Sequence, residues 1–260
     1  MAGAARVYYH ALAVIAGLDA PTLAYAAAAV FVGALVRGYT GFGSSMVWVS
    51  SLALVLPPAE VVPVILMLEV LASLHLLPKA WSAVQWSTVW PIMAAAWAAT
   101  PAGIWLLTRV PATLMQAAIS GVVLATSVLL WRGYALSRTP GMAATVTTGI
   151  VSGVLTGSTS AGGPPVVLFY LSTPAAVGVQ RASLIAYFLG SDAVGAGAAA
   201  LAGLVTADSF LRVGLLLPAM ILGTALGNRR FLHTTPEAFR RAALALLLAL
   251  GIAGLVRALV

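Results

Sequence analysis

Apolar runs long enough to cross a lipid bilayer recur along the whole sequence and limit the folds open to it. Their length of about 17 to 25 residues is what a helix needs to cross a hydrocarbon core of about 30 Å. Hydrophobic residues make up 62% of the chain and charged residues only 7%, which is too little charge for a soluble surface. The alternating pattern of a barrel strand does not recur. The sequence therefore predicts an all-α, polytopic membrane bundle.

The apolar runs fall into two halves with the same order of elements. We predict an N-terminal lead-in over residues 1–21, a first transmembrane repeat over 22–131, an inter-repeat loop over 132–141 and a second transmembrane repeat over 142–260. Together the repeats form a single membrane domain. The apolar run of the lead-in is short even for a signal peptide, so we favour a flexible or interfacial segment over a cleaved one.

Each half contains one short, glycine-punctuated break in its apolar sequence. The first break covers residues 38–45 (GYTGFGSS) and the second covers residues 158–165 (STSAGGPP). Gly43 lies 120 positions before Gly163, at the same point of its break. A broken backbone inside a bilayer is tolerated only where protein or a water-lined cavity surrounds it. Two matching breaks therefore indicate a substrate site near mid-membrane.

The segments beside the first break, residues 22–37 and 44–56, are short for full spans. They are either the half-helices of a re-entrant hairpin or two adapted spans. In both cases the hairpin returns to its starting side, so each half adds three net crossings and the second repeat is inverted relative to the first.

Basic residues orient such a bundle, because they concentrate on the cytoplasmic side. The side that we assign to the cytoplasm receives Lys79, Arg132, Arg138, Arg181, Arg229 and Arg230, and the other side receives Arg6, Arg109, Arg212 and Arg257. Both termini then lie outside.

The residues of the two breaks suit an anion bound at a helix N-terminus, where free N–H groups and the helix dipole favour negative charge. Glycines allow close backbone approach or positive φ, and serines can cap the next helix and donate to oxygen atoms. The predicted substrate-binding residues are Arg37, Gly41, Phe42, Gly43, Ser44, Ser45, Ser158, Thr159, Ser160, Gly162 and Gly163. The alternative is that these glycines only let helices pack closely.

Three charged residues lie in or near the apolar segments. Arg37 precedes Gly41 by one helical turn and could form a forked contact with an oxyanion; the alternative is an interfacial arginine that reaches the headgroups. Glu69 and Asp192 each lie in the span after a break, and intramembrane carboxyls are costly enough to indicate function. Either could carry a coupling proton, and the alternative is a hydrogen-bonded packing carboxyl.

Several functional classes are disfavoured by the sequence. The net charge of +7 comes from 13 scattered Lys and Arg residues, which helix orientation explains better than nucleic-acid binding. The chain has no cysteine and three scattered histidines, so we predict no metal site and no cofactor. No Gly-x-Ser-x-Gly motif occurs at the second break. We therefore predict that the protein is not an enzyme.

Two glycine motifs carry a family resemblance over nearly the whole chain. They are Gly33-x7-Gly41-Phe42-Gly43 in the first half, and Gly153-x3-Gly157 through Gly163-Pro164-Pro165 in the second. With these motifs in two halves between about residues 22 and 257, the chain resembles the TauE/SafE family of sulfite exporters and related anion permeases. The resemblance implies export of a small sulfur-containing anion, sulfite or an organosulfonate such as sulfoacetate, across a bacterial inner membrane.

Three functions remain open at this point. The first is export of such an anion by alternating access, with the site between the two breaks. The second is proton-coupled import of an anionic nutrient or a carboxylate through Glu69 or Asp192. The third is a membrane scaffold that does not transport. The expected partners are a small anion, the lipid bilayer and, for the second function, protons, and a homo-oligomer is compatible with the sequence.

Overall fold

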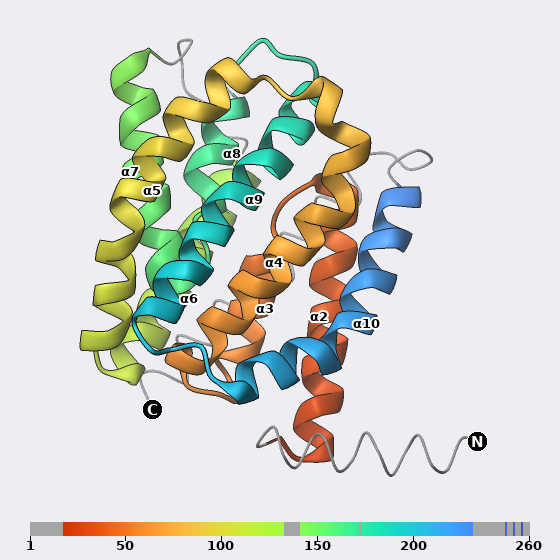
Figure 1. Ribbon diagram of the computed structural model, residues 1–260, viewed down its shortest axis with the longest axis vertical. Coiled ribbons are helices and arrows are strands. Elements are labelled where there is room, and N and C mark those ends of the chain that lie inside the picture. The colour runs from red at the N-terminus through yellow and green to blue at the C-terminus, as the bar shows by residue number, and fades with distance from the viewer. Residues whose placement is uncertain are drawn as a thin grey trace.

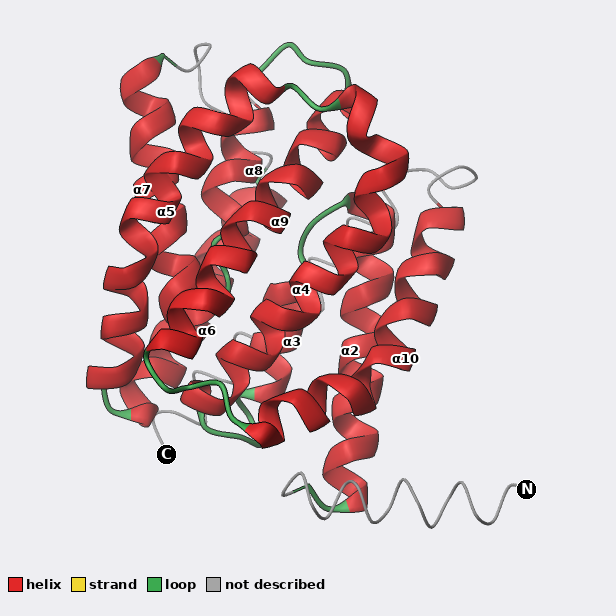
Figure 2. Ribbon diagram, in the orientation of Figure 1, coloured by secondary structure: helices red, strands yellow, loops and turns green. Residues whose placement is uncertain are grey.

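The computed structural model describes residues 18–132, 141–171 and 173–230 and the isolated positions 248, 252 and 256. All regular structure in these ranges is helical, without a strand (Figure 2). Five of the described helices are long and apolar enough to cross a membrane: α2, α4, α5, α9 and α10. The prediction of an all-α, polytopic membrane bundle is confirmed. Most of the predicted lead-in, most of the predicted inter-repeat loop and most of the predicted second repeat beyond residue 230 lie outside the described residues.

The helices follow one another through short connections (Figure 1). Those before residue 133 are α2 (Ala20–Thr40), α3 (Ser44–Leu52), α4 (Pro58–Ala80), the 3₁₀ turn η1 (Trp81–Ala83), α5 (Trp86–Arg109) and α6 (Ala112–Trp131). Those after it are α7 (Met142–Thr159), α8 (Gly163–Leu171), α9 (Val177–Leu201) and α10 (Ala207–Arg230).

Local sequence explains where the first helix starts. Asp19 caps α2, since its carboxylate accepts the Thr22 N–H at 3.0 Å. Hydrogen bonds from Thr22, with its hydroxyl contributing most, lower the pKa of Asp19. This is the preferred chemistry for a helix N-terminus, where backbone N–H groups have no partner within the helix.

α2 and α3 form an antiparallel hairpin. Gly41 and Gly43 between them have φ values of 84° and 89°, a conformation that glycine alone adopts at little cost. Trp48 on α3 donates to the Val30 carbonyl at 2.9 Å, and Tyr25 on α2 donates to the Ser51 carbonyl at 3.1 Å. α3 therefore runs back along α2 toward the end from which α2 came.

The two helices of this hairpin differ in length. α2 has 21 residues, enough to cross a bilayer, whereas α3 has nine residues and extends about 14 Å. The prediction that both flanking segments are short is therefore wrong for the first of them. We predicted its end at Arg37 because a charged residue commonly closes an apolar span. Arg37 is instead buried, and the helix continues to Thr40.

α7 and α8 form a second hairpin. α7 ends at Thr159, Ser160 follows in the left-handed region with φ 56°, and the nine-residue α8 starts at Gly163. Ser152 on α7 donates to the Gly162 carbonyl. A Cβ atom on Gly162 would lie 2.5 Å from the Ser152 carbonyl oxygen. The chain thus turns back so closely on α7 that only glycine fits at this position.

Glycines outside the breaks bring two pairs of parallel helices together, α5 with α7 and α2 with α10 (Figure 1). On α7, Cβ atoms on Gly153 and Gly157 would lie 2.2 and 2.4 Å from carbonyl oxygens of α5. On α10, a Cβ atom on Gly227 would lie 2.2 Å from the Leu35 carbonyl oxygen of α2. For these glycines, close helix packing is the role that the structure supports.

Gly153→Ala should destabilise the protein by about 1–3 kcal/mol, because the added methyl overlaps the Ala96 backbone of α5. Gly121→Ala on α6 is the matched control, since a Cβ there meets nothing within 4 Å. It should be neutral or stabilising by up to about 1 kcal/mol through helix propensity. Denaturant unfolding of the purified variants in detergent measures both, and equal effects would contradict the proposed packing contact.

Candidate functional site

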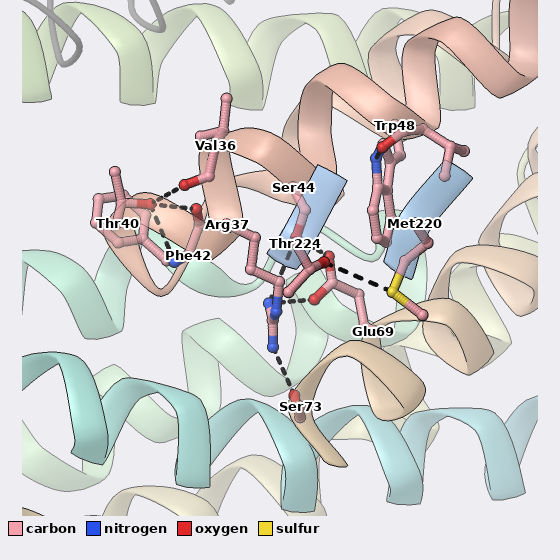
Figure 3. A network of polar contacts seen from close by, with 11 residues as sticks. Val36, Arg37, Thr40, Phe42, Ser44, Trp48, Glu69, Ser73, Met220 and Thr224 are labelled. Carbon is pink, nitrogen blue, oxygen red and sulfur yellow. Dashed lines mark hydrogen bonds and ion pairs between the residues drawn. The ribbon is translucent and has the colours of Figure 1, made fainter. Parts of the chain in front are cut away.

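The first break lies beside a buried ion pair between α2 and α4 (Figure 3). Arg37 in the last turn of α2 pairs with the carboxylate of Glu69 in the middle of α4, and both side chains are 1% exposed. The second guanidinium nitrogen, Nη2, donates to Ser73 Oγ at 2.5 Å. Ser73 follows Glu69 by one turn of α4, so α4 contacts the guanidinium at two points. Arg37 does not reach headgroups, and the interfacial interpretation is wrong.

The N-terminus of α3 also binds the Glu69 carboxylate. Ser44 Oγ donates to Glu69 Oε1, and the Ser45 backbone N–H donates to the same carboxyl. Arg37 Nη1 lies 3.4 Å from Ser44 Oγ. The N-terminus that we predicted to hold a substrate oxyanion thus holds a carboxylate of the protein itself, on the same donors that an oxyanion would use.

The predicted capping role of Ser44 and Ser45 is wrong. The N-cap of α3 is Gly43, without a side-chain hydrogen bond, and Ser44 is already the first helical residue. Its hydroxyl turns to Glu69 rather than to the backbone N–H groups of its own helix. The capping prediction failed because a carboxylate, 25 positions further along the chain, reaches the same donors.

The remaining residues of the first break hold the turn and connect it to the other half. Thr40 Oγ1 lies 2.7 Å from the Phe42 carbonyl oxygen and accepts the Phe42 N–H at 3.2 Å. The Phe42 ring packs against a cluster that includes Val166 and Val167 of α8. Gly41 lies against Arg181, whose guanidinium donates to the Gly38 carbonyl at 2.7 Å.

The three hydroxyl residues of the second break have different surroundings. Ser158 and Thr159 donate to the Val154 and Leu155 carbonyls of their own helix, at 2.7 and 2.8 Å. Ser160 is 2% exposed, and its hydroxyl has no hydrogen-bond partner among the described residues. Of the three, Ser160 therefore has the hydroxyl that is not already used within α7.

One aromatic ring lies between the two breaks. The Phe188 ring of α9 is centred 5.3 Å from Arg37 Cζ, at a distance typical of a cation–π contact. A Cβ atom on Gly163 would lie 3.2 Å from the far carbon of the same ring. The guanidinium beside the first break and the start of α8 at the second break therefore contact the same side chain. Sequence reasoning did not single out Phe188, and its sequence context holds no signal that could have indicated this role.

Asp192 lies opposite Glu69 where α4 and α9 pack antiparallel. Gly195 contacts Leu66, and Ile185 shares a cluster with Leu76, so that rising numbers on α4 match falling numbers on α9. By this register position 69 faces position 192. Asp192 is 4% exposed, and its Oδ2 has no hydrogen-bond partner among the described residues. It interacts electrostatically with both Glu69 and Arg37.

Buried hydroxyls connect α9 to the second hairpin. Tyr187 donates to Ser152 Oγ at 2.7 Å, and Ser152 donates in turn to the Gly162 carbonyl. One turn further, Ser191 Oγ lies 3.4 Å from Thr156 Oγ1. Sequence reasoning missed these residues. A serine directly before Asp192 inside an apolar span is the signal that could have indicated them.

The site therefore combines the buried Arg37 guanidinium, the N-terminus of α3 and two buried carboxyls. The guanidinium and the N-terminus are anion-binding groups, and the carboxyls are proton-binding groups. No three His, Asp or Glu side chains of the described residues come together as a metal site requires.

Comparison with known proteins gives one match. The family described as Sulfite exporter TauE/SafE matches residues 25–254 of the 260. Searches of curated proteins and of solved structures each returned no match. The family match covers α2 from Tyr25 onward and the other four helices of membrane-spanning length in full, together with α3, α7 and α8. It confirms the resemblance seen in the glycine motifs. The chain is a multi-pass membrane protein that belongs to the TauE/SafE sulfite exporter family of transporters.

Proposed function

We propose that this protein exports a small sulfur-containing anion, sulfite or an organosulfonate, across the bacterial inner membrane by alternating access. One observation carries the proposal: Arg37 and the N-terminus of α3 converge on a single buried point and bind a carboxylate there. Sulfite and sulfonates present the same kind of oxygen atoms as a carboxylate. A site that stabilises the Glu69 carboxylate therefore has the donors to stabilise these anions.

The predicted residues have unequal roles in this proposal. Arg37, Ser44 and the N–H groups after Gly43 bind the oxyanion, and Ser160 and the start of α8 after Gly163 complete the site from the other half. Phe42 and Phe188 line it. Gly41, Ser45 and Gly162 act through the backbone, and Ser158 and Thr159 are assigned to the packing of α7, because their hydroxyls are bonded there.

Alternating access needs two units that move against each other, and we propose the repeats 22–131 and 142–260 for this role. Their helix directions support an inverted pair. α2 and α7 start at opposite ends of the bundle, and each ends in a break followed by a nine-residue helix (Figure 1). α10 packs parallel to α2 and α5 packs parallel to α7, so each hairpin packs against a long helix of the other repeat. Rocking of one repeat against the other then exposes the site to each side in turn.

We assign the end of the bundle that carries Lys79, Arg132 and Arg229 to the cytoplasm. The charge balance supports this orientation, since Arg212 at the other end pairs with Glu60 at 2.7 Å and contributes less to positive charge there. Arg181 no longer counts as a loop residue. Arg181 lies inside α9, which begins at Val177, and it donates to the Gly38 carbonyl and to Asn228.

Flux of radiolabelled sulfite from proteoliposomes tests the proposal, with Gly43→Ala as the variant. Gly43 has φ 89° and Gly203, in the loop after α9, has φ 73°, so Gly203→Ala is a control with the same backbone strain of about 1–2 kcal/mol. Only Gly43→Ala should reduce flux, by about 5- to 30-fold, as expected when about 1–2 kcal/mol of binding is lost. Equal flux in the two variants would reject the site.

A second candidate is proton-coupled import of an anion through the same site. The two carboxyls near Arg37 favour it over a non-transporting scaffold, since a scaffold needs no buried charge in its core. The direction of net transport separates the two candidates: cells that express the protein should release labelled sulfite faster if it is an exporter and take it up faster if it is an importer.

A further inference from the structure

We propose that the Glu69 carboxylate occupies the oxyanion site when no substrate is bound, and that one proton taken up by Glu69 and Asp192 opens the site to the anion. This inference rests on the transport function proposed above and adds its coupling. One proton then moves together with each monovalent anion, and net flux follows the sum of the two gradients.

The first argument is that Glu69 already occupies the hydrogen-bond donors that a substrate would need. Its carboxylate pairs with Arg37 and accepts hydrogen bonds from the Ser44 hydroxyl and the Ser45 N–H. These donors point at one small volume, so Glu69 and a substrate oxyanion exclude each other. Glu69 is therefore a tethered competitor, and the anion binds only after the carboxylate has left.

The second argument is the count of charges that face the site from α2, α3, α4, α7 and α9. α2 supplies the Arg37 guanidinium, α4 the Glu69 carboxyl, and α9 the Asp192 carboxyl and the Tyr187 hydroxyl, whereas the facing residues of α3 and α7 are hydroxyls. Arg181 of α9 interacts electrostatically with Arg37 and donates to the Gly38 carbonyl and to Asn228, but it lies 11 residues from Asp192, about 16 Å along the helix. Arg37 is the guanidinium that pairs with a carboxylate of the site, where it faces two carboxyls.

A buried site of this kind is stable only near neutrality, because an unpaired buried charge costs several kcal/mol. Without substrate, the positive charge of Arg37 is balanced by the negative charge of one carboxylate, and the other carboxyl carries a proton. When a monovalent anion takes the place of Glu69, the balance requires a proton on the second carboxyl too. The proton comes from solution and forms an O–H bond on Glu69, which then has no charge to hold it at Arg37.

Proton uptake on sulfite binding measures the proposed coupling directly. Purified protein in weak buffer is mixed with sulfite, and a pH indicator counts protons while a separate titration gives Kd at several pH values. The comparison is with the double variant Glu69→Gln with Asp192→Asn. Sulfite itself titrates near neutral pH, but that contribution is the same for both proteins and cancels in the difference.

The wild type should take up about one more proton per bound anion than the double variant. The affinity of the wild type for sulfite should also fall more steeply with rising pH than that of the double variant. The extra factor should be about ten per pH unit, as linkage requires for one proton. Glu60→Gln is the matched control, because it removes a carboxyl from the same helix, far from Arg37, and should behave as the wild type does. Equal proton uptake by the wild type and a folded double variant overturns the coupling but leaves the anion site standing.

A second measurement covers the case in which the double variant does not fold. Wild-type proteoliposomes under an imposed pH gradient should accumulate labelled sulfite on the alkaline side faster than protein-free liposomes do. If the wild type carries sulfite at the same rate with and without the pH gradient, the proposed coupling is wrong. If the wild type neither binds nor carries sulfite or a sulfonate, the proposed function fails and the inference fails with it.

Discussion

Arg37→Gln should lower the free energy of unfolding by about 3–5 kcal/mol, the usual cost of leaving one partner of a buried ion pair without the other. Adding Glu69→Gln should restore most of that loss, because no carboxylate then remains at the N-terminus of α3 without its guanidinium. Sulfite flux should stay lost in the double variant, since the cation that attracts the substrate is absent. Denaturant unfolding in detergent and proteoliposome flux measure the two effects separately.

The Arg212–Glu60 pair is the control for this experiment. Its nitrogen–oxygen distance is 2.7 Å, but the Glu60 side chain is 47% exposed, so breaking it should cost about 0–1 kcal/mol. Arg212→Gln should also leave flux unchanged. If Arg37→Gln is no more destabilising than Arg212→Gln, the buried pair is not a major element of the fold. If the Arg37 and Glu69 double variant carries sulfite at the wild-type rate, Arg37 does not bind the substrate.

The sequence predicts the class of fold well because the solvent imposes it. A chain that is 62% hydrophobic cannot leave its backbone N–H and C=O groups unpaired in lipid, and helices satisfy them within each segment. Helix ends were harder to predict. Arg37 and Arg181 both suggested the edge of the membrane, yet both lie inside helices, because one pairs with Glu69 and the other donates to the Gly38 carbonyl.

The site was predictable only as far as local spacing reaches. Arg37 lies one helical turn before Gly41, so its place beside the first break follows from helix geometry. Its partner could not be predicted, because Glu69 is 32 positions away and its direction depends on how α4 is rotated against α2. The hydroxyls of the second break illustrate the same limit. Ser158 and Thr159 bond to their own helix, a rotamer choice that depends on the surrounding helices.

Gly163→Leu should abolish sulfite flux, because Gly163 already lies within contact distance of the Phe188 ring. A Cβ atom there would be 3.2 Å from the ring, and the rest of a leucine side chain would push the ring toward the Arg37 guanidinium, which lies 5.3 Å from the ring centre. Gly178→Leu in the first turn of α9 is the matched control, since a Cβ at that position meets nothing within 4 Å. It should leave flux unchanged.

Phe188→Ala added to Gly163→Leu separates obstruction of the site from loss of the fold. Removing the ring opens a space of about the size that the leucine fills, so the double variant should recover flux that Gly163→Leu has lost. Phe188→Ala alone should lower stability by about 3–5 kcal/mol, as for other buried phenylalanines. If the ring lies between the two anion-binding ends, the two substitutions compensate each other, with a coupling of about 0.5–3 kcal/mol in a double-mutant cycle. Purely additive losses would mean that Gly163 and Phe188 act at separate places and that the two breaks do not share one anion.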